Sequence, residues 1–328
     1  MVQILGVRVL PGQQDTMSSP IKIFSGSASE DLAEKISDFF GSPLGEIELL
    51  TFSDGEMQVY YEESIRGSDI FIVQSTFAPA DNLMELFLLI DAAKRASANQ
   101  IIVVIPYYGY ARQDRKFKSR VSVGAKLVAN VLTAVGADRV VTIDLHAGQI
   151  QGFFDIPVDH LDGTAVFIPY IESLNLENLC IASPDIGGSA RARRYAKHLS
   201  AELIICDKHR QKPNEVASMQ VIGDAKGKNI ILIDDLVDTA GTLCKAAEVL
   251  LDEGALSVRA IATHAVLSGP AYERIQNSKL KELAVTDTIP LDKEKNISKL
   301  RVLSVAPIFG KAFRKIHNNE SISSLFLK

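Results

Sequence analysis

Short apolar runs alternate with amphipathic segments along most of the chain. Runs such as Ile101–Ile105 and Ile230–Ile233 have the length and the aliphatic content of strands buried on both faces, as parallel strands are. Between such runs, apolar residues recur at helical spacing, for example in Leu83–Ser97 and Leu243–Glu253. Strands that alternate with helices predict a parallel sheet. The pattern therefore predicts an α/β fold.

This periodicity predicts eight strands and five helices. The predicted strands are Ile21–Phe24, Ile70–Gln74, Ile101–Ile105, Val140–Ile143, Leu179–Ala182, Leu203–Cys206, Ile230–Ile233 and Val258–Ala262. The predicted helices are Asp31–Phe40, Leu83–Ser97, Lys126–Val135, Ser189–Leu199 and Leu243–Glu253. The spacing of Ser27 and Glu30 suits a capping box at the start of the first helix.

The same unit of strand, loop and helix occurs once in each half of the sequence. In each half a buried strand and a polar loop precede a helix that ends on Gly-Ala, at Gly136 and at Gly254. We therefore predict two similar domains, each a mainly parallel sheet flanked by helices. The expected boundaries are an extension without assigned function at 1–20, domains at 21–163 and 164–305, and a last segment at 306–328 that returns to the first domain. The first copy carries a longer loop, Pro106–Gly124, and such loops are more often functional than idle.

Composition narrows the class of protein. A chain of 328 residues makes about two domains, and 47% hydrophobic with 23% charged residues describes an ordinary globular protein. The formal net charge of −5 argues against a nucleic-acid partner, and no apolar run approaches the length of a membrane span. Three widely spaced cysteines predict reduced thiols in the cytoplasm rather than a disulfide framework.

The segment from Ile230 to Thr242 carries the strongest chemical signal. Asp234 and Asp235 stand where the buried strand is expected to end, and a polar loop of small residues leads into the next helix. Ligands of α/β sheets collect at the carboxyl ends of strands, and free N–H groups before a helix hold phosphate. Carboxylates beside such a loop suit the hydroxyls and the Mg²⁺ of a phosphorylated sugar. The alternative is a strand, turn and helix in which Asp and Thr act only as caps.

A second candidate site follows the strand Ile101–Ile105. There Arg112 and Gln113 begin a basic loop that could hold a polyphosphate and shield it from water. The alternatives are a solvated charged loop and a basic, aromatic RNA-binding patch, which the acidic net charge makes less favourable.

Further polar residues follow other strands. His146 and Asp185 could share a nucleotide-borne Mg²⁺, and Lys208 with Arg210 could stabilise charge on a transferring phosphoryl group. Each also has a structural alternative. His146 would be a hydrogen-bonded structural histidine, Gly187-Gly188 after Asp185 would form a tight turn, and Lys208 with Arg210 would lie on a surface turn. The turn Phe52-Ser53-Asp54-Gly55-Glu56 offers one ring and two carboxylates that could hold an adenine.

Common motifs of other enzyme classes are absent from the sequence. It contains no G-x-x-x-x-G-K-[ST], G-x-S-x-G or H-E-x-x-H string and no paired C-x-x-C. Readings as a P-loop nucleotidase, a serine hydrolase or a zinc enzyme therefore have no motif support.

Taken together, these strings resemble the ribose-phosphate pyrophosphokinases, which have a duplicated phosphoribosyltransferase type I fold. The resemblance runs from about Ile21 to Phe326. It includes Phe52–Glu56, Asp81–Leu86, Pro106–Arg115, Asp144–Ala147, Gln149–Asp155, Ser183–Gly188, Lys208–Arg210 and Asp234–Thr242. The loop at 238–242 alone would indicate only the wider phosphoribosyltransferase superfamily, whereas the motifs of the first half single out this family.

The resemblance implies a reaction and its ligands. Such enzymes transfer the β,γ-diphosphoryl group of MgATP to the 1-hydroxyl of ribose 5-phosphate, and form AMP and 5-phosphoribosyl 1-pyrophosphate (PRPP). PRPP feeds purine, pyrimidine, NAD, histidine and tryptophan synthesis. The resemblance also implies homohexamers built from dimers, activation by inorganic phosphate and inhibition by ADP.

The resemblance further implies a role for each matching residue. It assigns catalysis to Lys208 and Arg210, and it assigns Mg²⁺ binding to His146 and Asp185. ATP binding falls to Phe52, Asp54, Gly55, Glu56, Arg112, Gln113 and His146, with the residues at 52–56 reaching the adenine from a neighbouring subunit. Ribose 5-phosphate binding falls to Asp234, Asp235, Asp238, Thr239, Ala240, Gly241 and Thr242. The shared regulatory site falls to Ser64, Arg66, Ser119, Arg120 and Ser321.

Two rival functions stay open on the sequence alone. A phosphoribosyltransferase that consumes PRPP would keep residues 234–242 but need not keep Phe52–Glu56 or the Arg112 loop. A regulatory homologue without activity would typically lose catalytic positions, which are present here.

Overall fold

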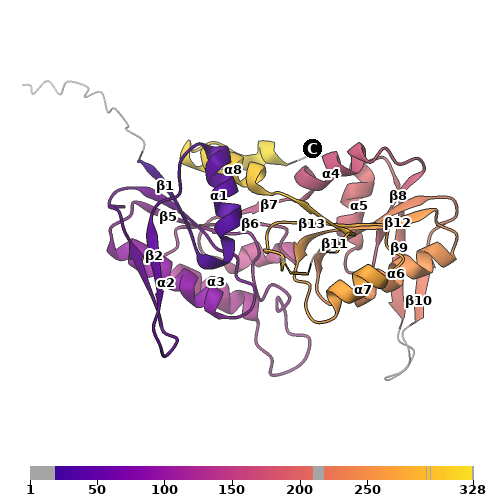
Figure 1. Ribbon diagram of the computed structural model, residues 1–328, viewed down its shortest axis with the longest axis horizontal. Coiled ribbons are helices and arrows are strands. Elements are labelled where there is room, and N and C mark those ends of the chain that lie inside the picture. The colour runs from indigo at the N-terminus through magenta and orange to yellow at the C-terminus, as the bar shows by residue number, and fades with distance from the viewer. Residues whose placement is uncertain (1–18, 210–217, 293, 296, 327–328) are drawn as a thin grey trace, which may run out of the picture.

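The structure is a computed structural model that describes residues 19–209, 218–292, 294–295 and 297–326. Two sheets lie side by side, each between layers of helices, with α8 beside α1 over the first sheet (Figure 1). We call the first sheet with its helices the first lobe and the other sheet with its helices the second lobe. The extension at residues 1–18 lies outside the described residues.

The first sheet is parallel throughout. Its order is β1 (Ile21–Ser25), β4 (Asp69–Val73), β5 (Gln100–Ile105), β6 (Arg139–Ile143) and β7 (Val158–Leu161). Alternate residues of β4 face opposite sides. Ile70 and Ile72 pack under α2 (Asp81–Arg95) and α3 (Gly124–Val135), while Phe71 and Val73 pack under α1 (Glu30–Phe40) and α8 (Ala306–His317).

The second sheet has one antiparallel edge. Its order is β10 (Ser218–Ile222), β9 (Glu202–His209), β8 (Leu179–Ser183), β11 (Asn229–Val237), β12 (Ser257–Ala265), β13 (Leu283–Thr286) and β14 (Leu300–Leu303). Only the β9–β10 pair among these runs antiparallel. One face packs under α6 (Gly241–Asp252) and α7 (Ala271–Asn277), and the other under α4 (Thr164–Ser173) and α5 (Ser189–His198). The predicted α/β class with mainly parallel sheets is confirmed.

Several elements were not predicted. A separate antiparallel hairpin joins β2 (Ile47–Thr51) to β3 (Met57–Tyr61), and 3-10 turns occupy Ser27–Ser29, Gly148–Phe153 and Ile322–Leu325. The edge strands β7, β10 and β14, the inner strand β13 and the helices α4, α7 and α8 were also missed. The strands are four or five residues long, and α7 has seven residues, so their apolar patterns are weak, whereas α8 has twelve residues and was missed despite its length.

Three local predictions were wrong. The strand at Ile230 continues through Asp234 and Asp235 to Val237, because β12 is equally long and pairs with it along its length. The strand at Leu203 likewise continues to His209, paired with β10, so Lys208 lies within it. The capping box does not form, because Ser27 donates its hydroxyl and backbone N–H to Glu85 instead.

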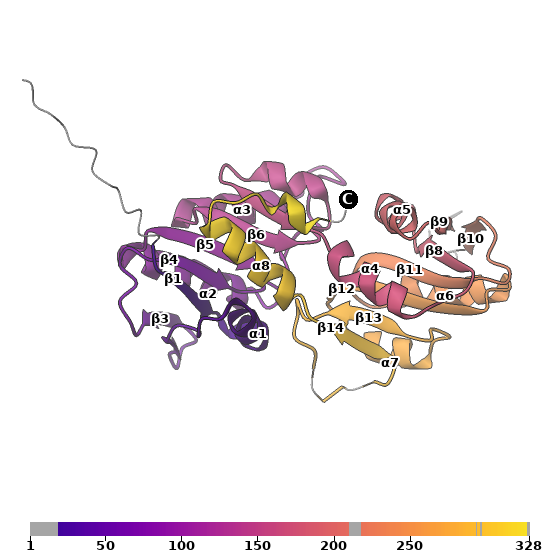
Figure 2. The same ribbon diagram turned by 90° about the horizontal axis from the view of Figure 1, so that it is seen from above.

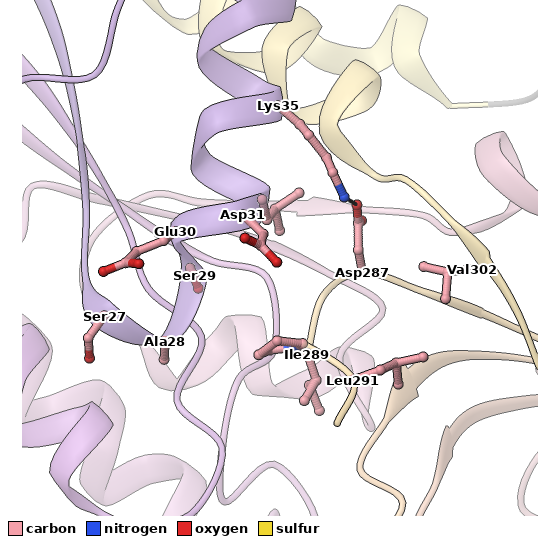
Figure 3. A pocket seen from close by; sticks show the side chains of 12 residues that line it. Ser27, Ala28, Ser29, Glu30, Asp31, Lys35, Asp287, Ile289, Leu291 and Val302 are labelled. Carbon is pink, nitrogen blue, oxygen red and sulfur yellow. Dashed lines mark hydrogen bonds and ion pairs between the residues drawn. The ribbon is translucent and has the colours of Figure 1, made fainter. Parts of the chain in front are cut away.

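The last helix covers the first sheet. Phe309 and Phe313 are fully buried in the cluster that holds Phe71, and the rings of Phe313 and Phe71 stack with centroids 4.2 Å apart. Where the chain leaves β14 for α8, the Val305 N–H donates to Asp287 Oδ1 at 2.9 Å. The other carboxylate oxygen of Asp287 pairs with Lys35 Nζ of α1 at 3.0 Å, beside a pocket at the lobe junction (Figure 3).

Viewed from above, the chain crosses between the lobes twice, before α4 and before α8 (Figure 2). Among the described residues, no helix has both the length and the apolar composition to cross a bilayer. All three cysteines are free, as predicted.

Replacing Phe313 with Ala should lower the free energy of unfolding by about 3–5 kcal/mol, because a fully buried ring is lost and a cavity remains. Urea unfolding monitored by circular dichroism measures this change. Phe117→Ala is the matched control, since that ring is 77% exposed and its loss should change stability by less than about 0.5 kcal/mol. Equal losses in the two variants would contradict the packing of α8 described here.

Candidate active site

The candidate site lies where loops of the two lobes meet. The long loop after β5 brings Arg112 of the first lobe against Asp238, which directly follows β11 of the second. Arg112 Nη1 donates to Asp238 Oδ2 at 2.7 Å. Asp238 also accepts a hydrogen bond from the Ser268 hydroxyl. Burial opposes the charge on Asp238, but these two donors outweigh it and lower its pKa.

A second contact joins the lobes. His146, just past β6, lies with Nδ1 2.7 Å from Oδ2 of Asp235 in β11. The hydrogen bond to Asp235 raises the pKa of His146, against the opposing effect of burial. Burial would raise the pKa of Asp235, but the hydrogen bond from His146 and the charge of Arg191 hold it below its ordinary value.

Asp234 differs from its neighbour. Burial first, and then the Asp235 carboxylate, raise the pKa of Asp234 well above its ordinary value. Asp185, at the end of β8, accepts the Gly188 N–H at 2.8 Å, and its charge adds to the effect on Asp234. The charged form of Asp234 is thus disfavoured, whereas cationic partners favour the charged forms of Asp235 and Asp238.

The loop before α6, which was predicted to bind phosphate, turns sharply into the helix. Ala240 adopts φ +58°, which turns the chain sharply so that α6 begins at Gly241. The first N–H groups of a helix have no partner within it, so those of α6 are available to an anion. From α7, Arg274 Nη1 donates to the Thr239 carbonyl at 3.0 Å and holds the loop from behind.

The residues that were predicted to bind ATP fall into two groups. Arg112 and Gln113 line one pocket with Thr76, Phe77 and Tyr107. By contrast, Phe52, Asp54, Gly55 and Glu56 form the tip of the β2–β3 hairpin, which points downward from the side of the first lobe far from the second sheet (Figure 1). The Phe52 ring is 49% exposed. Within one chain the hairpin is therefore not brought to Arg112.

Other predicted residues are not joined in the structure. The residues of the predicted regulatory site, Ser64, Arg66, Ser119, Arg120 and Ser321, are exposed, and the described hydrogen bonds and ion pairs do not link them with one another. The backbone of Lys208 lies in β9, but its side chain and the whole of Arg210 lie outside the described residues. No cluster of three or more metal-ligating side chains occurs among the described residues.

Sequence reasoning assigned no role to four residues that contact the predicted site residues. Ser268 and Arg274 hold the phosphate loop, while Asp144 and Arg191 lie behind Asp235 and His146. Arg191 follows Gly187-Gly188 on a helix that also carries Arg193 and Arg194. A basic residue on such a helix predicts a solvated face, so the sequence offered no signal that separated Arg191 from its neighbours.

Two mainly parallel sheets, each covered by helices and with loops that meet at one junction, have a phosphoribosyltransferase-type fold. Residues 21–136 match the N-terminal domain of ribose phosphate pyrophosphokinase, and residues 181–327 match the phosphoribosyl synthetase-associated domain. The chain belongs to the ribose-phosphate pyrophosphokinase family.

Individual relatives agree along nearly the whole chain. The ribose-phosphate pyrophosphokinase of Campylobacter jejuni is 57% identical over 93% of this chain and 99% of its own length. That of Porphyromonas gingivalis is 55% identical over 93% and 97%. The crystal structure of phosphoribosylpyrophosphate synthetase from Mycobacterium smegmatis superposes with a TM-score of 0.87 at 39% identity, over 92% of this chain and all of that one.

The left-handed turn at Ala240 yields a prediction. Ala240→Val should weaken the binding of ribose 5-phosphate by about tenfold or more, because a β-branched residue at positive φ costs about 1–3 kcal/mol and distorts the loop. Ala240→Gly is the matched control and should bind within about twofold of the wild type, since glycine accepts this conformation. Calorimetric titration measures both, and tight binding by the valine variant would contradict the proposed phosphate loop.

Proposed function

We infer that this chain transfers the β,γ-diphosphoryl group of ATP to the 1-hydroxyl of ribose 5-phosphate, giving PRPP and AMP. The contact between Arg112 and Asp238 carries this proposal. Arg112 belongs to the loop that would hold the ATP phosphates, and Asp238 begins the loop that would hold the sugar phosphate. Their direct contact means that ligands of the two loops would lie next to each other.

The reaction is a direct in-line displacement. The anomeric oxygen attacks the β-phosphorus, the bond between that phosphorus and the oxygen bridging to the α-phosphate breaks, and AMP leaves. The hydroxyl proton passes to solvent or to a group at the junction. An anomeric hydroxyl is a modest nucleophile, so most of the rate comes from alignment and from neutralising charge. Neither contribution requires a covalent intermediate with the protein.

Each side chain has a proposed part in this reaction. Asp238, Thr239, Ala240, Gly241 and Thr242 bind the sugar 5-phosphate, and Asp234 with Asp235 orient the ribose hydroxyls. Arg112 and Gln113 bind the ATP phosphates. Lys208 and Arg210 stabilise negative charge on the transferring group.

The acidic junction suits Mg²⁺. Asp234 is buried beside the Asp235 carboxylate and its pKa is raised, so a divalent cation would relieve their repulsion. Asp185 and His146 would be further donors, His146 directly or through a water. Because no three metal-ligating side chains cluster among the described residues, phosphate oxygens of the nucleotide would supply the remaining ligands. When bound with the nucleotide, Mg²⁺ would neutralise phosphate charge. His146 and the carboxylates orient the ligands around it.

The proposal extends to the assembly. The exposed Phe52 hairpin would reach the adenine pocket of a neighbouring copy in a homohexamer built from dimers, so that the complete site exists between subunits. A monomeric mass by light scattering, with full activity at the same concentration, would exclude this arrangement.

We also propose that residues 21–163 and 164–305 are separate domains, with 306–328 part of the first, and that the chain resides in the cytoplasm. Regulation by inorganic phosphate and ADP is proposed as well, and the dependence of the rate on each ion tests it.

The purified chain, given ATP, ribose 5-phosphate and Mg²⁺, should release AMP and PRPP in equal amounts, and a chelator should stop the reaction. Chromatography of the nucleotides and a coupled assay for PRPP measure both products. The control supplies PRPP with purine and pyrimidine bases, from which no nucleotide should form. Nucleotide formation in the control without ATP-dependent PRPP synthesis would assign the chain to the base-modifying phosphoribosyltransferases instead.

Lys208→Ala should lower kcat by about two or more powers of ten and leave ATP affinity nearly intact, because the lysine acts on charge that grows in the transition state. Steady-state kinetics and ATP titration measure the two effects separately. A near-normal kcat in this variant would remove Lys208 from the catalytic role.

A further inference from the structure

A buried arginine lies between the two halves of the site. Arg191 comes from the first turns of α5 in the second lobe, and its side chain is only 13% exposed. One guanidinium nitrogen lies 3.5 Å from Asp144 Oδ1 of the first lobe. Another lies 3.8 Å from Asp235 Oδ1 of the second lobe. A single side chain therefore contacts carboxylates from both lobes.

Asp144 is itself held from both sides. Its carboxylate accepts the Gly163 N–H at 3.1 Å and the Thr263 hydroxyl of β12, and its backbone carbonyl lies 3.2 Å from His264 Nε2. The residue has φ +46°, an uncommon conformation for Asp that these contacts maintain. Because His146 follows two residues later, the position of Asp144 determines where His146 enters the site.

The contacts of Asp235 continue the chain of interactions. Its Oδ2 lies 2.7 Å from His146 Nδ1, and its Oδ1 faces Arg191. Arg191, Asp144, His146 and Asp235 thus form a closed loop of backbone and side-chain contacts that crosses the lobe junction. An ammonium group could not replace the guanidinium fully, because the planar guanidinium places separate nitrogens near two carboxylates, whereas the ammonium of lysine is a point charge.

We propose that Arg191 is a positioning residue that fixes the register between the two halves of the active site by contacting Asp144 and Asp235 at once. The inference rests on the proposed function and adds a residue to it. Arg191 need not touch the substrates. Its removal leaves Asp235 and Asp144 as neighbouring buried carboxylates without their shared cation, so both shift and carry His146 with them.

Arg194 provides a matched control. It lies one turn further along α5, pairs with Asp162 at 3.4 Å, and its side chain is 52% exposed. An exposed pair of this kind contributes little to stability. The same substitution at Arg194 therefore tests for general effects of removing a cation from this helix.

The experiment compares Arg191→Ala, Arg191→Lys and Arg194→Ala with the wild type. Arg191→Ala should lower kcat by about a hundredfold, since small misplacements of reacting groups cost that much, while KM for ATP stays within about twofold. Arg191→Lys should recover part of the loss. Dilute guanidinium should raise kcat of Arg191→Ala but not that of Arg194→Ala, and urea should raise neither.

Hydrogen exchange gives a readout that does not require activity. In Arg191→Ala, and not in Arg194→Ala, amide protection should fall both near Asp144 and near Asp235, because the tie between lobes is lost. Unchanged exchange, or kcat within about threefold of the wild type, would overturn the proposal. If Arg191→Ala fails to fold, Arg191→Lys decides, and full activity in it would also overturn the proposal, because charge alone would then suffice.

The outcome separates the two hypotheses. A wild-type chain that forms no AMP or PRPP defeats the proposed function, whatever the variants do. An active wild type with an equally active Arg191→Ala defeats only the role of Arg191. Parallel rises in both KM values and a fall in kcat without guanidinium rescue would assign Arg191 a purely structural role.

Discussion

Buried carboxylates need cationic or hydrogen-bonding partners, and here that need joins the two lobes. Asp144 and Asp235 come from different sheets and share Arg191, while His146 and Arg112 of the first lobe reach Asp235 and Asp238 of the second. An ionised side chain left unpaired in the interior costs several kcal/mol. The lobes therefore cannot separate locally without a loss of stability, and the same contacts align the two groups of ligand-binding loops.

The sequence predicted the central strands and the helices that cover them, because buried parallel strands and amphipathic helices carry strong periodic patterns. It missed β13 and β14, whose four residues each are too few for a clear periodic pattern, and it also missed the twelve-residue helix α8. The strand ends near Asp234 and Lys208 were also wrong. The polar residues there suggested a loop, but pairing with β12 and β10 extends both strands.

The site was predictable where local chemistry is distinctive and not where it depends on distant partners. The loop at Asp238–Thr242 combines small residues, a helix start and a preceding strand, all of which are visible in sequence. Arg191 is one of three arginines on α5, and only the fold distinguishes it by burying it against Asp144. The contact of Arg112 with Asp238 joins residues 126 positions apart, a separation that no local pattern encodes.

The two crossings between the lobes limit how they can move. Residues 162–163 lead from β7 into α4, and residues 304–305 lead from β14 back to α8 on the first sheet. A body attached at two points cannot drift or spin freely, and its easiest motion is a rocking about the line through both attachments. Asp287, bonded to Lys35 and to Val305, stands next to one of these points. The chain thus enters and leaves the second lobe through the first, and these two covalent attachments restrict sideways sliding of one lobe against the other.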